Sequence, residues 1–125
     1  MDTVSSWVLE DAELPWTTNA ERTWHYHKRA KKIREARERW AWIAKASKIP
    51  KLEKISVEAT PLKASRRSMP DVAACYPSVK AAIDGLVDAN IILDDDPVHV
   101  IRITFNSPEV GSKNGLRLQI NKESD

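Results

Sequence analysis

The 125-residue sequence has a single cysteine, three glycines and no long apolar run, and each shortage excludes a class of protein. Cys75 alone forms no internal disulfide, and the acidic N-terminus lacks the basic-then-apolar order of a secretory signal, so a reducing, cytosolic compartment is expected. Glycines at 85, 111 and 115 leave no phosphate-cradling loop, so no nucleotide cofactor is expected. No apolar run approaches the roughly 18–20 residues that span a bilayer, which argues against membrane insertion.

Charge is strongly segregated along the chain, although the formal net charge is only +2. Residues 1–20 carry four acids and no lysine or arginine, residues 21–67 carry fifteen bases against five acids, and residues 68–125 carry five bases against nine acids. Lysine and arginine release counterions from a polyanion, whereas clustered carboxylates repel phosphate unless a cation lies between them. This order of basic and acidic segments indicates a protein that binds nucleic acid together with a metal ion. A solvated helix face followed by acidic turns is the alternative.

Two helices are predicted, over residues 21–48 and 77–90, and the length fits one domain with a modest core. Pro50 stops the first helix. Its apolar residues recur at spacings of three and four, as on one buried stripe: Ile33, Ala36, Trp40 and Ile43. Trp40 and Trp42 cannot share that stripe, so we expect one of them to pack against another element or a second subunit.

Strands are predicted at residues 52–62, 98–105 and 116–120. The first alternates apolar and polar side chains like a half-buried strand, and Pro61 suggests an edge or a strand end. The second is β-branched and apolar, which predicts a well-buried strand. A turn at residues 111–115 predicts that the last two strands form a C-terminal hairpin. Helices packed on this mixed sheet would make a small α+β, or mixed α/β, single domain of residues 1–125.

Acidic residues flank the second helix and are candidate metal ligands. Asp71 precedes the helix, and the triplet of Asp94, Asp95 and Asp96 follows it. The helix spans about 20 Å, so the two acidic sites meet only if the loop carrying Asp71 runs along the sheet or a neighbouring subunit supplies that residue. If they meet, carboxylate, water and phosphate oxygens would form the octahedral site that Mg²⁺ prefers.

Lys80, in the first turn of the second helix, would stabilise charge that develops on a phosphate or a leaving oxygen. The structural alternative is that an aspartate triplet before a proline is a solvated turn, and that Lys80 pairs with Asp84 at i+4. The three histidines have no partners at zinc-ligand spacing, and Cys75 has no histidine base nearby in sequence. We therefore expect neither a zinc site nor a cysteine nucleophile.

These residues resemble the RusA family of Holliday junction resolvases, which bacteriophages and prophages carry. The resemblance extends over about residues 7–121. It rests on four segments: Leu14-Pro15-Trp16 with Asn19 close behind, Arg66-Arg67 before Asp71, the stretch from Lys80 to Ala89, and Leu93-Asp94-Asp95 before an apolar strand.

The resemblance implies a RusA-like fold and a homodimer that binds four-way DNA junctions and makes paired nicks. Mg²⁺ would be the cofactor, with Mn²⁺ as a substitute, and the cytoplasm of a bacterial host would be the location. By the same resemblance Asp71, Lys80 and Asp95 look like the catalytic residues. Asp71, Asp94 and Asp95 look like the metal ligands, and of the last two we favour Asp95.

One departure from the family concerns the loop before the helix. The family loop usually reads Asp-x-Asp-Asn, whereas here Asp71 is followed by Val72, Ala73 and Ala74. A site with one acid fewer would recruit Asp84 or Asp96, or the protein would bind branched DNA and cut it weakly or not at all.

DNA contacts are expected from basic side chains of the first predicted helix and of the connection after the first predicted strand. Lysine and arginine at these positions would contact phosphates, so the shape of the DNA rather than its sequence should dominate recognition. The residues are Lys28, Arg29, Lys32, Lys63, Arg66 and Arg67.

Overall fold

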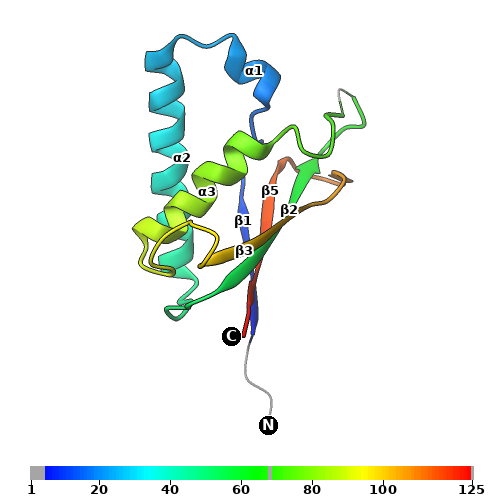
Figure 1. Ribbon diagram of the computed structural model, residues 1–125. Coiled ribbons are helices and arrows are strands. Elements are labelled where there is room, and N and C mark those ends of the chain that lie inside the picture. The colour runs from blue at the N-terminus through cyan, green and yellow to red at the C-terminus, as the bar shows by residue number, and fades with distance from the viewer. Residues whose placement is uncertain (1–4, 68, 125) are drawn as a thin grey trace.

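The computed structural model describes residues 5–67 and 69–124, in which three helices and five strands form one layer of helices on one sheet (Figure 1). In chain order the elements are β1 (Ser6–Asp11), α1 (Thr18–Arg22), α2 (Tyr26–Ala46), β2 (Ile55–Lys63), α3 (Tyr76–Asp88), β3 (Val100–Phe105), β4 (Glu109–Val110) and β5 (Gly115–Lys122). The sheet contains parallel and antiparallel pairs, so the predicted α+β class with a mixed sheet is confirmed.

The central part of the sheet is β2, in the strand order β1-β5-β2-β3. β5 pairs antiparallel with both β1 and β2, while β3 and the short β4 pair parallel with β2 on its other side. The predicted C-terminal hairpin is therefore wrong. A parallel pair needs a long crossover, which α3 supplies between β2 and β3, and β5 takes the opposite side of β2 beside β1, a strand that the sequence patterns do not predict.

Burial along the strands follows from this order. β2 has neighbours on both sides and is buried along most of its length, whereas β3 is an edge strand and is half-exposed, contrary to the prediction of a well-buried strand. Pro61 lies within β2, not at an edge or a strand end. Ala59 and Lys63 turn their backbone groups toward β3 and β4, so the missing N–H of Pro61 faces the gap between those two strands.

The single helix predicted over residues 21–48 is instead two helices, α1 and α2, separated by a short turn. Thr23 ends α1, where its backbone N–H donates to carbonyls of that helix. His25 then has an extended backbone, and its Nδ1 accepts the His27 N–H at 3.3 Å, which caps α2. These local hydrogen bonds outweigh the helical periodicity of the surrounding residues.

The two long helices, α2 and α3, pack on the same face of the sheet (Figure 1). Trp40 is 1% exposed in the core, whereas Trp42 is 72% exposed on the other side of α2. A Cβ atom built on Gly85 of α3 would lie 2.8 Å from both the Arg37 carbonyl oxygen and the Trp40 Cβ, so the two helices meet at their backbones. In the described part of the chain, no helix has the length and apolarity needed to cross a membrane.

We expect Gly85→Ala to lower the free energy of unfolding by about 1–2 kcal/mol, because the added methyl group forces α2 away. This overpacking outweighs the roughly 1 kcal/mol that alanine gains over glycine in helix propensity. Urea denaturation measures the change. Gly111→Ala is the matched control, since a Cβ atom there meets nothing within 4 Å. Equal unfolding midpoints for Gly85→Ala and the unaltered protein would contradict the close helix contact.

Candidate active site

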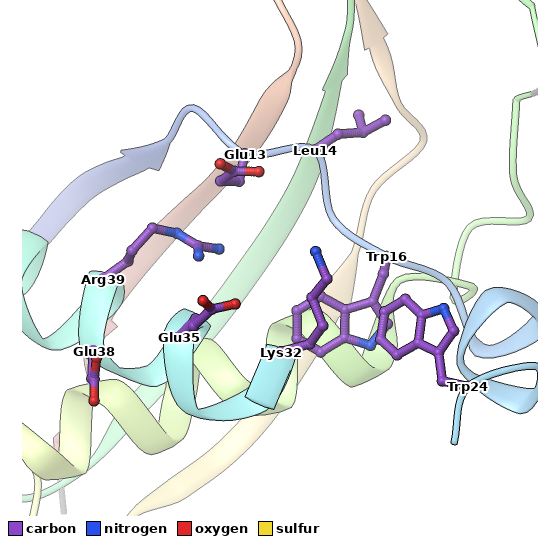
Figure 2. A pocket seen from close by; sticks show the side chains of 8 residues that line it. All are labelled: Glu13, Leu14, Trp16, Trp24, Lys32, Glu35, Glu38 and Arg39. Atoms are coloured by element: carbon purple, nitrogen blue, oxygen red, sulfur yellow. The ribbon is translucent and has the colours of Figure 1, made fainter. Parts of the chain in front are cut away.

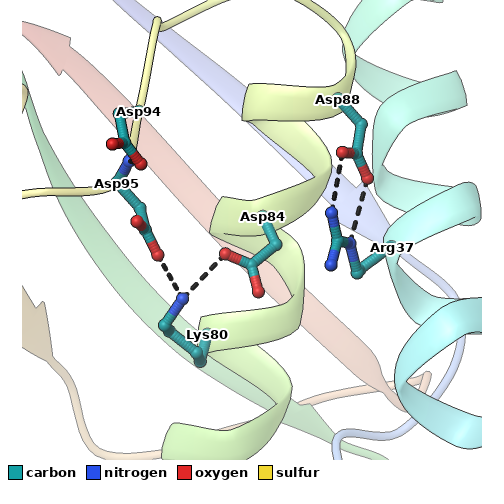
Figure 3. A network of polar contacts seen from close by, with 6 residues as sticks. All are labelled: Arg37, Lys80, Asp84, Asp88, Asp94 and Asp95. Carbon is teal, nitrogen blue, oxygen red and sulfur yellow. Dashed lines mark hydrogen bonds and ion pairs between the residues drawn. The ribbon is translucent and has the colours of Figure 1, made fainter. Parts of the chain in front are cut away.

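Lys80 lies between two carboxylates, those of Asp84 and Asp95 (Figure 3). Its Nζ donates to Asp84 Oδ1 at 2.7 Å and also to Asp95 Oδ2. Lys80 and Asp84 are one turn apart on α3, while Asp95 belongs to the loop that follows this helix. We call these three residues the acid–lysine cluster. Their side chains are between 22% and 41% exposed, so solvent and ligands can reach them.

The loop after α3 returns over the helix because apolar residues anchor it. Asn90 has a φ of 62°, in the left-handed region, which ends the helix. Ile91 is then buried, and its carbonyl accepts the Leu52 N–H at 2.7 Å. With this part of the loop fixed against the core, the following residues bring Asp95 beside Lys80.

Burial and charge act on the cluster in opposite directions. Burial raises the pKa of Asp84, whereas hydrogen bonding from Lys80 lowers the pKa of Asp95 to about 2. Burial on its own would lower the pKa of Lys80, but the hydrogen bonds to the two carboxylates raise it overall. The lysine therefore stays protonated, Asp95 stays ionised, and Asp84 is the carboxylate that takes up a proton first as the pH falls.

The three consecutive aspartates of the loop make different contacts. Asp94 is exposed and accepts the backbone N–H of Asp95 at 2.7 Å. Asp96 accepts the backbone N–H groups of Val98 and His99 at 3.1 Å, and its Oδ1 lies 2.7 Å from His99 Nδ1. Asp95 is therefore the member of the triplet that contacts Lys80, while Asp94 and Asp96 hold the shape of the loop.

Asp71, expected to be catalytic and metal-binding, lies on the exposed connection before α3. It lines a pocket of about 480 Å³ that contains none of the residues of the acid–lysine cluster, together with Asn19 and Lys63. Within residues 5–67 and 69–124, no three His, Cys, Asp or Glu side chains are grouped so that they could hold a metal ion. Asp71 thus does not join Asp94 and Asp95 in such a group within this chain. Its supply by a neighbouring subunit stays a prediction.

The lysine and arginine residues expected to bind DNA occupy two segments toward the upper end of the molecule in Figure 1. On the first two turns of α2 they are exposed, and one ammonium lies 5.2 Å from the centre of the Trp24 ring. The second set lies at the end of β2 and in the connection after it, where Lys63 is half-buried and Arg66 and Arg67 are exposed. The two sets are Lys28, Arg29 and Lys32, with Lys28 over the ring, and Lys63, Arg66 and Arg67.

Other bases of α2 have structural partners that sequence reasoning misses. Arg37 binds Asp88 of α3 through two hydrogen bonds, at 2.8 and 3.0 Å (Figure 3). Arg39 binds the buried Asp11 of β1 at 3.1 Å. The alternation of Trp7, Leu9 and Asp11 was the available signal, because it puts this acid on the inner side of a strand.

Comparison of the sequence with models of known protein families and with curated proteins gives no match. Membership of the RusA family therefore stays a prediction. The acid–lysine cluster and the basic residues near the upper end of the molecule are the features from which a function can be inferred.

In a carbon-detected NMR titration, the Asp95 carboxyl should have a midpoint near pH 2, well below the ordinary 3.8, because Lys80 stabilises its charged form. Since the folded state has the lower pKa, the contribution of Asp95 to stability is present above about pH 4 and is lost as the pH falls through 2. Lys80→Met should return the midpoint to 3.8 or higher. An ordinary midpoint in the unaltered protein would show that Lys80 and Asp95 do not interact in solution.

Proposed function

We propose that the protein is a Mg²⁺-dependent, structure-specific DNA endonuclease of the RusA type that resolves four-way junctions by paired nicks. The observation that carries this proposal is the acid–lysine cluster, in which two carboxylates hold one positive charge at a solvent-accessible position. Metal-assisted phosphodiester hydrolysis needs carboxylate ligands and a cation near the charge that develops on the phosphate. Asp84 and Asp95 supply the carboxylates, and each is hydrogen-bonded to the cation, Lys80.

The donor set of the cluster fits Mg²⁺, with Mn²⁺ as a substitute. Mg²⁺ keeps several waters and binds through one or two carboxylates plus phosphate oxygens, and Asp84 and Asp95 are two such carboxylates. When bound, Mg²⁺ polarises the phosphodiester and supplies a hydroxide. Asp84 would take the role of the acid that Ala73 replaces, and Asp71 would contribute from a partner subunit.

Among the chain's own groups, Lys80 has the central role. Its ammonium bridges the two carboxylates, and an incoming phosphate would draw it away from one of them. The released ammonium would stabilise negative charge on the phosphate or on the leaving oxygen. Asp84 would hold a proton more readily than Asp95, because burial raises the pKa of Asp84, and Asp95 would remain the ionised ligand.

Branched DNA would lie across the upper end of the molecule, against the six exposed or half-buried lysine and arginine residues described above. A four-way junction is two-fold symmetric, so two symmetric nicks require a homodimer. Trp42, exposed on α2, is apolar material for the dimer interface. The cytoplasm of a bacterium that hosts a phage or prophage is the location where such DNA would be processed.

Binding of branched DNA without cleavage is the second candidate function. It is favoured by the missing third carboxylate, since no metal-holding group of three acids, histidines or cysteines occurs among the residues that the structure describes. It is also favoured by Lys80, which already pairs with Asp84 and Asp95 and offsets one of their two negative charges. In that case the lysine would take the place of the metal ion permanently.

The endonuclease proposal predicts paired nicks in a labelled four-way junction with Mg²⁺, and their loss in Asp95→Asn and Lys80→Met. We expect the nicking rate to fall by about 100-fold or more, because each change removes a group that stabilises charge in the transition state. Junction binding should survive or strengthen in Asp95→Asn, since this change removes a negative charge that repels phosphate. Gel analysis of nicked products and a binding titration measure the two effects.

Asp88→Asn is the matched control for this experiment, because it removes a carboxylate of α3 that binds Arg37 and lies outside the cluster. Persistent nicking in Asp95→Asn would disprove the site. A protein that binds junctions but cuts none with Mg²⁺ or Mn²⁺ would support the second candidate. Loss of nicking in Asp71→Asn would indicate that the partner subunit completes the site.

Binding should weaken steeply with salt, because phosphate contacts release counterions. Neutralising Arg66 and Arg67 with glutamine should reduce the slope of log K against log salt by about one unit per lost contact. Lys45→Gln is the control, since it removes an exposed charge at the other end of α2. Equal slopes for the arginine variant and the unaltered protein would mean that DNA binds elsewhere.

A further inference from the structure

A concave surface lies between the segment after β1 and the middle of α2, and it shares no residue with the acid–lysine cluster (Figure 2). The pocket has a volume of about 450 Å³. Two indole rings, Trp16 and Trp24, lie side by side at one end of it. The rest is lined by two residues of the segment after β1, Glu13 and Leu14, and by charged side chains of α2, namely Lys32, Glu35, Glu38 and Arg39. A planar group the size of a nucleobase fits a pocket of this volume.

Hydrogen bonds hold Trp16 in position, and the ring of Trp24 lies against it, while part of the surface of both stays accessible. Their ring centroids are 5.8 Å apart, with planes inclined at 44°. The backbone N–H of Trp16 donates to Ser78 Oγ at 2.7 Å, and its indole Nε1 donates to Glu21 Oε2 at 2.8 Å. Both tryptophans are only half-buried. Held in this way, the pair is a preorganised aromatic surface on which another ring can stack.

Cations lie beside this aromatic surface on the adjoining turns of α2. The Lys28 ammonium is 5.2 Å from the centre of the Trp24 ring, and Lys32 lines the pocket itself. Arg39, further along the pocket, is neutralised by Asp11. Aromatic rings next to exposed lysines bind unpaired nucleic acid, because bases stack on the rings and phosphates contact the cations. The Glu35 carboxylate would accept a hydrogen bond from an N–H group of a base.

We propose that this pocket binds an unpaired base of the DNA substrate, with the base stacked on Trp24 and the adjoining phosphates on Lys28 and Lys32. The inference deepens the proposed function, because it takes DNA as the ligand. Bases within a continuous duplex have no free ring face, whereas bases at a branch point can be exposed. The pocket would therefore favour DNA with unpaired bases over a fully paired duplex of the same charge.

The test compares binding of two fluorescent oligonucleotides by anisotropy, in EDTA and at low salt. One is a short thymidine oligonucleotide, and the other is an abasic strand of the same length with identical phosphates. The unaltered protein should bind the thymidine strand about 5- to 100-fold more tightly, the range expected for stacking of a base on an aromatic ring. Trp24→Ala should reduce this ratio to near one, and Trp24→Phe, which keeps an aromatic ring, should retain most of it.

Tyr76→Ala is the matched control, because Tyr76 is an exposed aromatic residue of α3 outside the pocket. Its base preference should equal that of the unaltered protein, and circular dichroism should show that every variant is folded. Equal affinity of the unaltered protein for the two strands would overturn the inference, as would an unchanged ratio in folded Trp24→Ala. Because EDTA removes divalent metal ions, this assay measures binding without cleavage. A base preference in a protein that never nicks junctions with Mg²⁺ would therefore support the pocket while refuting the endonuclease.

Discussion

The contact between α2 and α3 at Gly85 is the constraint on which the candidate site depends. Because glycine has no side chain, the backbone of α3 can lie against Arg37 and Trp40 of α2. The rotation of α3 is then fixed, with its apolar residues toward the core and Lys80 and Asp84 at the surface. The same rotation presents Lys80 to the loop that carries Asp95, so the position of the acid–lysine cluster follows from the packing of two helices.

The basic residues of α2 fall into two sets, a difference that the net charge conceals. Arg37 and Arg39 bind Asp88 and Asp11, and these pairs join α2 to α3 and to β1. The bases nearer the N-terminus of α2 are exposed to solvent, and one of them lies over the Trp24 ring. The exposed Arg37–Asp88 pair contributes little to stability and mainly orients the two helices. Arg39 instead compensates the buried carboxylate of Asp11, which would be costly to leave unpaired.

Local patterns predicted both long helices and three of the strands, because hydrophobic periodicity is visible within a short segment. The order of the strands was not predictable in this way, because the pairing of β5 with β1 and β2, and of β3 with β2, joins segments far apart in sequence. The i+4 pair of Lys80 and Asp84 was readable from spacing. The approach of Asp95 to Lys80 was not predictable. It depends on Ile91, which is buried in the core and accepts a hydrogen bond from Leu52, a residue distant in sequence.

The proposed endonuclease requires that Asp84 and Asp95 form a cation site in which Lys80 and a divalent metal ion can exchange. Paramagnetic broadening by Mn²⁺ in NMR spectra of the isotope-labelled protein tests it most directly. At low Mn²⁺ the amide signals of Asp84 and Asp95 should broaden first, ahead of Asp71 and Asp88, because two carboxylates bind a hard cation better than one. Broadening that begins at Asp71, or that spreads evenly over all exposed acids, would contradict the account.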